Sequence, residues 1–297
     1  MRNSIRILLL LMFIIPGFSL GLSGVFAKSS LIQVLRVDGA IVPVVADYID
    51  RGITHAEETS ASMVIIEINT PGGLLSTTER IVDRMLDAKI PVIVYVDRWA
   101  GSAGTFITLA AHVAAMAPAS RIGAASPVSI QPGEAGISDT LEKKINEDTA
   151  ARIRSLANLS GRNEVAAVAT VVDALSFTDQ EALGILPISD NHQEILKTDA
   201  PYLDPPLVEI GAENLNSLIA QLNGRTVTVA GKELVIDTTD FHQNQLDMNI
   251  FERFLQVISD PNIAFLLLSI GSLGIILELY SPGTIIPGAV GGISLLM

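Results

Sequence analysis

The last 37 residues of the chain, 261–297, contain a single charged side chain, Glu278. Within them Ile263–Tyr280 is a long apolar stretch. A helix of this length nearly spans a bilayer, because each residue adds about 1.5 Å along the axis. The stretch has almost no polar face, which favours lipid over the alternative of a buried core hairpin. The sequence therefore predicts a membrane anchor at this end.

A second apolar segment, Thr284–Met297, follows a predicted turn at Ser281-Pro282-Gly283. Small residues at Gly271, Ser272 and Gly274 would let the two segments pack closely. The sequence stops inside the second segment without a charged flank, so we expect a further part of the protein beyond it.

The first 27 residues have the pattern of a secretory signal peptide. Arg2 and Arg6 supply a basic start, Ile7–Phe18 is apolar, and Ala27 is a small residue at the expected cleavage point. An uncleaved N-terminal anchor is the alternative. With either interpretation the folded part of the chain is exported from the cytoplasm. The topology of the C-terminal segments is not indicated, because no Lys or Arg follows Arg253.

The composition excludes several classes of protein. The net charge is −13 and there is no basic run, so the chain repels nucleic acid. Only 17% of residues are charged and 49% are hydrophobic, which excludes a disordered chain. There is no Cys, so disulfides, thiolate nucleophiles and Cys-type metal sites are excluded together.

Between the two ends, short apolar runs alternate with amphipathic stretches. This alternation is typical of βα units around a mostly parallel sheet. Strands are predicted at Leu31–Val37, Met63–Ile68, Val92–Val96 and Ile122–Ala124, and helices at Val44–Glu58 (opened by Pro43), Leu75–Ala88, Ser102–Ala115 and Asp139–Leu159, with a loop at Val128–Ser138. Further on, Asn214–Leu222 is a predicted helix, and Thr226–Val229 with Glu233–Ile236 a hairpin.

Two turns at the carboxyl ends of predicted strands could carry chemistry, since open α/β sheets place their sites there. Asn69-Thr70-Pro71-Gly72-Gly73 follows one strand, and its paired glycines can direct backbone N–H groups at an oxyanion. Ala100-Gly101-Ser102-Ala103-Gly104-Thr105 follows the next strand and leaves the Ser102 hydroxyl open. An ordinary turn and an ordinary N-cap serine are the alternatives. Consecutive strands would place the two turns side by side.

A nucleophilic Ser102 needs a base. His112 lies too far along the same predicted helix to return to Ser102, and His55, His192 and His242 lie in polar stretches. A hydrolase elbow using His192 stays open, although that pattern has Gly where this chain has Ala100. If no histidine is the base, a Lys or a carboxylate must accept the proton of Ser102.

Lys144 lies at the border of the apolar face of the predicted helix Asp139–Leu159, whereas Lys143 points to solvent. Burial at that border would favour the neutral amine, which can accept the serine proton. A snorkelling surface lysine is the alternative.

The chain from about residue 31 onwards resembles the NfeD family, membrane-bound serine proteases of the ClpP class encoded beside stomatin-like proteins. The resemblance rests on the runs Ile66–Gly73, Gly101–Thr105, Met116–Pro118, Ile122–Val128, Lys144-Ile145, Ser160–Asn163, Glu181–Gly184 and Tyr280–Gly283.

The resemblance implies an α/β fold, a ClpP/crotonase-like ββα-superhelix domain followed by transmembrane helices. It implies a Ser–Lys dyad of Ser102 and Lys144, with Gly72 or Gly73 and the Ala103 N–H as the oxyanion hole. Soluble Clp subunits have their catalytic His two positions before a Pro, where this sequence has Ala125 before Pro127, so no His is expected in the site.

The expected organisation is a signal peptide at 1–27, a protease domain at 28–205, a helix–hairpin segment at 206–258 leading to the membrane, and transmembrane segments at 261–297. The resemblance further implies cleavage of hydrophobic segments of a stomatin-like membrane protein, contact with membrane lipid, assembly as a homodimer, and no cofactor or metal. Three alternatives stay open: a non-catalytic scaffold for a stomatin-like protein, an enzyme resembling signal-peptide peptidase, and a crotonase-type acyl-CoA enzyme.

Overall fold

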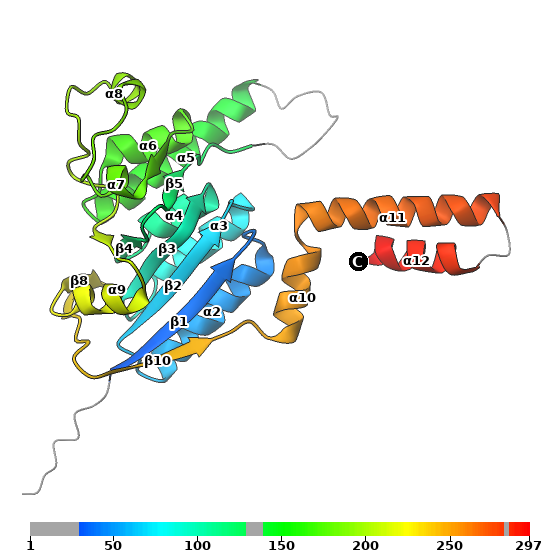
Figure 1. Cartoon of the computed structure of the whole chain (residues 1–297), viewed down its shortest axis with the longest axis horizontal. Coiled ribbons are helices and arrows are strands. Elements are labelled where there is room, and N and C mark those ends of the chain that lie inside the picture. The colour runs from blue at the N-terminus through cyan, green and yellow to red at the C-terminus, as the bar shows by residue number, and fades with distance from the viewer. Residues whose placement is uncertain (1–29, 129–138, 282–284) are drawn as a thin grey trace, which may run out of the picture.

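A parallel sheet forms the centre of the molecule, a computed structural model that describes residues 30–128, 139–281 and 285–297 (Figure 1). The predicted signal peptide and residues 129–138 of the predicted loop lie outside the described residues. In spatial order the parallel strands are β10 (Phe241–Leu246), β1 (Ser30–Asp38), β2 (Met63–Thr70), β3 (Val92–Gly101), β4 (Val113–Met116) and β7 (Ile210–Gly211).

Both faces of the central strands are buried, as expected for a parallel sheet. Alternate residues of a strand point to opposite faces. In β1, Leu35 and Val37 join the larger hydrophobic cluster, while Ile32 and Val34 join a smaller cluster on the other face. The larger cluster includes side chains of α2 (Pro43–Glu58), α3 (Leu75–Leu86), α4 (Ala103–Leu109), α5 (Asp139–Leu159) and α6 (Glu164–Val172). As predicted, Pro43 occupies the first turn of α2.

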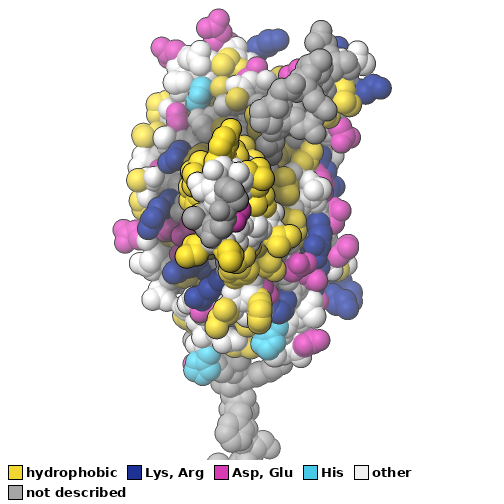
Figure 2. Space-filling model, turned by 90° about the vertical axis from the view of Figure 1, so that its right-hand side faces the viewer, with side chains coloured by type: hydrophobic (Ala, Val, Ile, Leu, Met, Phe, Trp, Pro, Cys, Tyr) yellow, Lys and Arg dark blue, Asp and Glu magenta, His cyan; other side chains and the backbone are white. Residues whose placement is uncertain are grey.

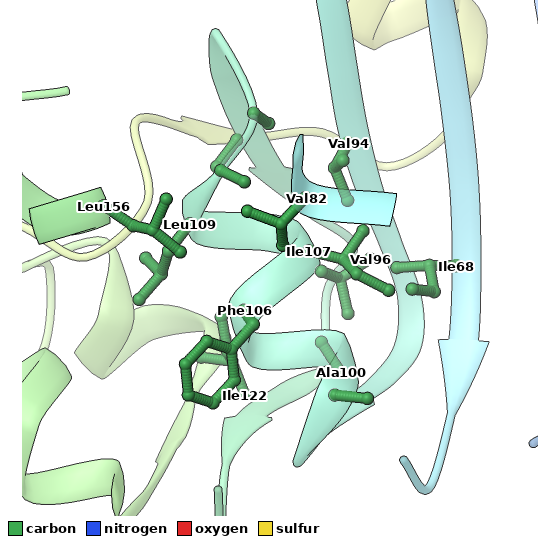
Figure 3. Packing of buried hydrophobic residues seen from close by; sticks show 14 of the residues in the cluster. Ile68, Val82, Val94, Val96, Ala100, Phe106, Ile107, Leu109, Ile122 and Leu156 are labelled. Atoms are coloured by element: carbon green, nitrogen blue, oxygen red, sulfur yellow. The ribbon is translucent and has the colours of Figure 1, made fainter. Parts of the chain in front are cut away.

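Helix α4 is shorter than the sequence predicts. It ends at Leu109, and the apolar run Val113–Met116 is not helical but forms strand β4. All four residues of β4 are buried beside β3, so sheet packing overrides the helix propensity of the two alanines. Figure 3 shows Phe106, Ile107 and Leu109 of α4 within the larger cluster, with Val94 of β3 nearby.

Strand β3 changes partner along its length. Ile93–Val96 pair with β4, and the last three residues, Trp99–Gly101, pair with β5 (Arg121–Gly123). The antiparallel strand β6 (Ser176–Thr178) then pairs with β5. The end of β3 thus pairs with β5, which does not pair with its start, and Ser102 follows directly.

The segment 206–258 adds to the sheet as well as leading to the membrane. Its first strand, β7, pairs with β4, and its last, β10, pairs with β1 at the opposite edge. Between them lie α9 (Leu215–Leu222) and the hairpin of β8 (Thr226–Val229) and β9 (Lys232–Val235), both predicted. Strand β10 was not predicted, because its exposed polar residues show no apolar alternation.

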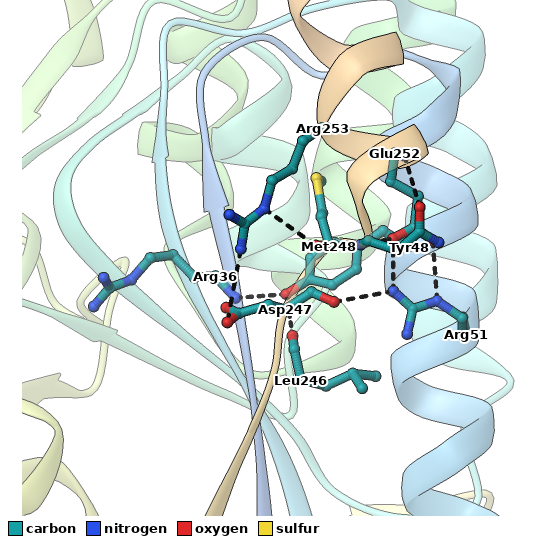
Figure 4. A network of polar contacts seen from close by, with 9 residues as sticks. Arg36, Tyr48, Arg51, Leu246, Asp247, Met248, Glu252 and Arg253 are labelled. Carbon is teal, nitrogen blue, oxygen red and sulfur yellow. Dashed lines mark hydrogen bonds and ion pairs between the residues drawn. The ribbon is translucent and has the colours of Figure 1, made fainter.

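The end of β10 is fastened to α2. The buried Tyr48 of α2 donates a hydrogen bond to the Leu246 carbonyl (2.7 Å) and accepts one from the Arg36 N–H (2.9 Å), as Figure 4 shows. Burial raises the pKa of Tyr48 to about 12, so the hydroxyl stays protonated and can donate. Two short helices, α7 (Asp179–Ala182) and α8 (Asp190–Leu196), lie near α6 on the other side of the sheet's centre (Figure 1).

The chain ends in three helices. They are α10 (Ile250–Ile258), α11 (Pro261–Tyr280) and α12 (Ile285–Leu296). Residues Ile263–Tyr280 of α11 are apolar enough to cross a membrane. Gly271 and Gly274 allow the predicted close packing, since a methyl on Gly271 would lie 2.5 Å from Leu295 Cγ and one on Gly274 2.5 Å from the Pro287 carbonyl oxygen.

Candidate active site

The two predicted turns lie side by side, because β2 and β3 are neighbours and Thr70 is in register with Ala100. A methyl built on Gly104, in the first turn of α4, would lie 2.7 Å from Thr70 Cγ2. The start of α4 therefore packs directly on the end of β2. This close approach requires a glycine at position 104.

The first turn is held rigidly by backbone contacts. The Ile41 N–H donates to the Gly72 carbonyl (2.8 Å), and the Leu74 N–H donates to the Ile41 carbonyl (3.0 Å). A methyl on Gly73 would lie 2.1 Å from the Ile41 carbonyl oxygen, so position 73 has no room for a side chain. The buried Thr70 hydroxyl accepts a hydrogen bond from the Gly72 N–H (3.0 Å).

Ser102 sits at the junction of β3 and α4 in an unusual backbone conformation. Its φ is 47° and its ψ is −109°, and a non-glycine residue rarely adopts a positive φ. Its N–H donates to the Gly123 carbonyl of β5 (2.9 Å). Thr105 braces the same junction, because its hydroxyl donates to the Ala100 carbonyl (2.9 Å) and accepts from the Gly123 N–H (3.1 Å).

The Ser102 hydroxyl forms no hydrogen bond that would stabilise the described part of the fold. Although Ser102 is the N-cap of α4, its side chain does not cap the helix. It makes no hydrogen bond to any residue that the structure describes, and Ser102 is half-buried. The alternative of an ordinary capping serine therefore does not fit, and backbone strain at a free hydroxyl is characteristic of functional sites.

Two backbone donors near this serine are free. Within residues 30–128 and the later described ranges, neither the Gly73 nor the Ala103 N–H donates a hydrogen bond. Gly72, the third predicted donor, differs because Thr70 already takes its N–H. Gly72 therefore does not offer a free N–H. Its missing side chain instead lets the turn lie close to Ser102.

Lys144 is not close to the core, contrary to the sequence expectation. It is exposed on α5, and no hydrogen bond joins it to Ser102 or to any other described residue. The helix is buried only further along, at Thr149, Ile153 and Leu156. The start of α5 extends away from the central sheet in Figure 1, and Leu141–Lys144 are exposed among the residues that the structure describes.

None of the four histidines bonds to Ser102. Nδ1 of His112 accepts a hydrogen bond from the Val92 N–H (3.1 Å), and His192 packs edge-on against Phe177 with ring centroids 5.1 Å apart. His55 lies on α2 and His242 on β10. The sequence excludes His112 as the base for Ser102, and this arrangement is consistent with that. The reason differs, because His112 follows α4 instead of lying within it.

Sequence reasoning missed the residues that hold the site in shape. Thr70 and Thr105 lie within the two predicted turns, but the sequence assigned them no role, and only their bonds to Gly72 and Gly123 reveal it. Trp99 was also missed: its ring covers Gly101, where a methyl would lie 2.6 Å from it, and the Arg121 guanidinium stacks 4.4 Å from its centre. Among the described residues no group of three His, Asp or Glu side chains could hold a metal.

A cavity of about 700 Å³ lies at the other end of α4, away from Ser102. Ala110, His112, Glu209 and Arg225 are among its lining residues. Glu209 is already engaged there, since it accepts hydrogen bonds from the buried Arg162 (2.6 Å) and the Ala114 N–H (2.7 Å). The cavity therefore lies apart from the two predicted turns, and its carboxylate is held in internal hydrogen bonds.

Two family descriptions match the chain. Residues 31–186 match the N-terminal domain of NfeD1b, and residues 262–297 match the NfeD integral membrane domain. The first match contains both turns and Lys144, and the second contains most of α11 and all of α12.

Two curated relatives align along almost the whole chain. Membrane-bound protease PH1510 of Pyrococcus horikoshii is 33% identical over 93% of this chain and 58% of its own length. Membrane protein NfeD1b of Bacillus subtilis is 27% identical over 95% of this chain and 61% of its own length. The chain thus spans about three fifths of the length of these relatives.

Solved structures of a similar protease domain share the fold. The 1510-N membrane-bound stomatin-specific protease, as a lysine-to-alanine variant with a substrate peptide, is 30% identical, with a TM-score of 0.66 over 78% of this chain and 99% of that one. A serine-to-alanine variant of it is 31% identical, with a TM-score of 0.63 over 74% of this chain and 99% of that one. The predicted α/β fold is confirmed by these matches, and the predicted apolar C-terminal helices are present as α11 and α12.

Proposed function

This chain belongs to the NfeD family, and from that premise we propose that it is a membrane-anchored serine endopeptidase with Ser102 as nucleophile and Lys144 as general base. The family resemblance read from the sequence motifs is confirmed by the match over residues 31–186. The chain is a membrane protein, since residues 262–297 match an integral membrane domain. The side of the membrane that carries the protease domain stays a prediction, namely the exported side.

The free hydroxyl of Ser102 is the observation that carries the proposal. The Ser102 oxygen would attack a peptide carbonyl, and the resulting oxyanion would lie between the free N–H groups of Gly73 and Ala103. A serine on a strained turn between a strand and a helix, with its hydroxyl unused, is the arrangement that acyl-transfer sites use.

Lys144 has to approach Ser102 during catalysis. In its present position the amine is exposed, so a movement of the first turns of α5 is part of the proposal. The buried side chains of α5 lie from Thr149 onwards, whereas Lys144 lies before them. Hydrogen bonds between catalytic groups often form only when substrate is bound.

The proposed substrate is a hydrophobic segment of a stomatin-like membrane protein. Support comes from the relative described as a stomatin-specific protease, and from a membrane anchor that would hold the enzyme beside such a substrate. The predicted homodimer and the signal-peptide cleavage stay predictions.

A second candidate function is a non-catalytic scaffold for a stomatin-like protein. The exposed position of Lys144 favours it, because a base that never reaches Ser102 cannot activate the serine. A relative described only as a membrane protein is compatible with either function.

The two functions are separated by comparing two serine variants. Ser102→Ala should abolish cleavage of an apolar peptide taken from a stomatin-like protein, while the folded state is retained. Ser155→Ala, which removes an exposed hydroxyl from α5, should cleave like the parent. Cleavage retained in Ser102→Ala would overturn the proposed mechanism. Co-purification with the stomatin-like protein in the absence of any cleavage by the parent would support the scaffold.

A further inference from the structure

Helix α10 exposes its apolar face to the surroundings. Its exposed apolar side chains are Ile250 (84%), Phe251 (79%), Phe254 (49%), Leu255 (44%) and Val257 (56%). With about 100° between successive residues, all five fall on one side of the helix. No residue of α10 is buried. An apolar face of this kind needs a cover that the described residues do not supply.

The polar face of α10 points inwards to the protease domain, as Figure 4 shows for Glu252. Glu252 forms an ion pair with Arg51 of α2 (2.7 Å) and also accepts from the Asn249 N–H (2.7 Å) in a capping box. Gln256 donates to the Asp38 carbonyl at the end of β1 (3.0 Å). This is the reverse of a surface helix on a water-soluble domain, which packs its apolar face inwards.

The membrane segment begins directly after α10. Ser259 and Asp260 alone separate it from α11, and α10 runs transverse to the α11–α12 hairpin in Figure 1. If α11 crosses the bilayer, α10 lies along the plane of its surface. Figure 2 looks along the hairpin and shows hydrophobic side chains on it and just beneath it, at the height of α10 in Figure 1.

We propose that α10 is an interfacial helix whose apolar face is embedded in the lipid at the boundary between headgroups and acyl chains. Interfacial helices lie at this depth with their apolar residues in the acyl region. Here the protein itself, through Arg51 and Asp38, takes the polar face that headgroups and water usually solvate. A second copy of the chain or a protein partner could also cover an apolar face, but the continuity of α10 with the membrane segment favours lipid.

The contact between Gln256 and Asp38 gives the interfacial helix a fixed position relative to the sheet. Asp38 ends β1, and β1 is separated from β3 by β2 alone. Neighbouring strands are about 4.8 Å apart, so the end of β3 lies roughly 10 Å from this contact. The bilayer surface and Ser102 are therefore at the same end of the sheet. The interfacial position of α10 does not itself depend on the proposed catalysis.

The absence of Cys from the sequence allows a direct test by site-specific labelling. Phe251→Cys is labelled with the environment-sensitive fluorophore NBD, and the chain is reconstituted into phosphatidylcholine vesicles. A second set of vesicles contains phosphatidylcholine brominated near the top of the acyl chains, where it quenches only probes in contact with lipid. Val235→Cys is the matched control. Val235 is an exposed apolar residue (67%) on β9, away from the membrane helices α11 and α12.

The proposal predicts blue-shifted emission from the Phe251 label and strong quenching by brominated lipid, with water-like, unquenched emission from the Val235 label. Phe254→Cys should behave like Phe251→Cys, and it replaces Phe251→Cys as the labelling position if that variant does not fold. Water-like emission at the α10 positions would overturn the proposal. Blue-shifted emission without quenching would also overturn it, because protein rather than lipid would then cover the helix.

Discussion

Gly72 and Ser102 face each other across the ends of β2 and β3. A methyl group built on Gly72 would lie 2.7 Å from Ser102 Cβ and 3.2 Å from its hydroxyl oxygen. The φ of Gly72 is +124°, a conformation that residues with side chains rarely adopt. The space in front of the serine hydroxyl therefore depends on the missing side chain at position 72.

We expect Gly72→Ala to inactivate the enzyme while leaving it folded. The added methyl group collides with Ser102, and the backbone strain should lower the free energy of unfolding by about 1–3 kcal/mol. Cleavage assays and thermal unfolding in detergent measure the two effects. Gly231→Ala is the control, because Gly231 also has a positive φ (+76°) but no neighbour within 4 Å. It should lose stability and keep activity. Parental cleavage by Gly72→Ala would contradict the described geometry.

Much of the fold could be predicted from the sequence because the parallel strands are continuous apolar runs. Helix α5 begins and ends at the predicted residues, and α2 begins at Pro43 as expected. Strand β4 was missed because an alanine-rich run suits a helix as well as a buried strand. Strand β10 was missed because its partner β1 lies about 200 residues away, and pairing over that distance leaves no local pattern.

The site was predictable in part. The placement of Ser102 beside Gly72 follows from the order of β2 and β3, which the sequence indicates. The exposure of Lys144 does not follow from helical periodicity. Periodicity identifies the face on which a residue lies, but not how far along the helix a neighbouring layer extends. In α5 that layer begins near Thr149.

Arg162 should be essential for stability. Its buried guanidinium donates to Glu209 (2.6 Å) and to the carbonyls of Leu109 (2.6 Å) and Ala111 (2.9 Å). Arg162→Met removes these three hydrogen bonds and leaves the Glu209 carboxylate without its cation, which should cost about 3–5 kcal/mol. Thermal unfolding in detergent would show a large fall in Tm. The exposed Arg154→Met should change stability by less than about 0.5 kcal/mol. Equal Tm values for the two variants would contradict the prediction.

His112 should make stability depend on pH below about 6.5. Burial lowers the pKa of His112 from 6.5, and Arg162 lowers it further. Its Nδ1 also accepts from the Val92 N–H, which requires the neutral ring. Below pH 6.5 the unfolded chain therefore binds a proton that the native state does not, so stability falls as the pH decreases towards the native pKa.

The measurement is the midpoint of unfolding between pH 7.5 and 5, about one unit or more on either side of the ordinary histidine pKa. His112→Asn removes the titrating group and should flatten the decline. The exposed His242→Asn should keep the decline of the parent. Identical profiles for the parent and His112→Asn would show that another group is responsible.

The most direct test of the proposed Ser–Lys mechanism compares two adjacent lysines. Lys143 and Lys144 are both exposed on α5 in the structure, so exposure does not distinguish them. Cleavage of the same apolar peptide is measured for Lys143→Ala and Lys144→Ala in membranes. We predict that Lys144→Ala loses activity by about 10²–10⁴-fold, the usual contribution of a general base, while Lys143→Ala cleaves like the parent. Equal activity of the two variants would contradict the mechanism.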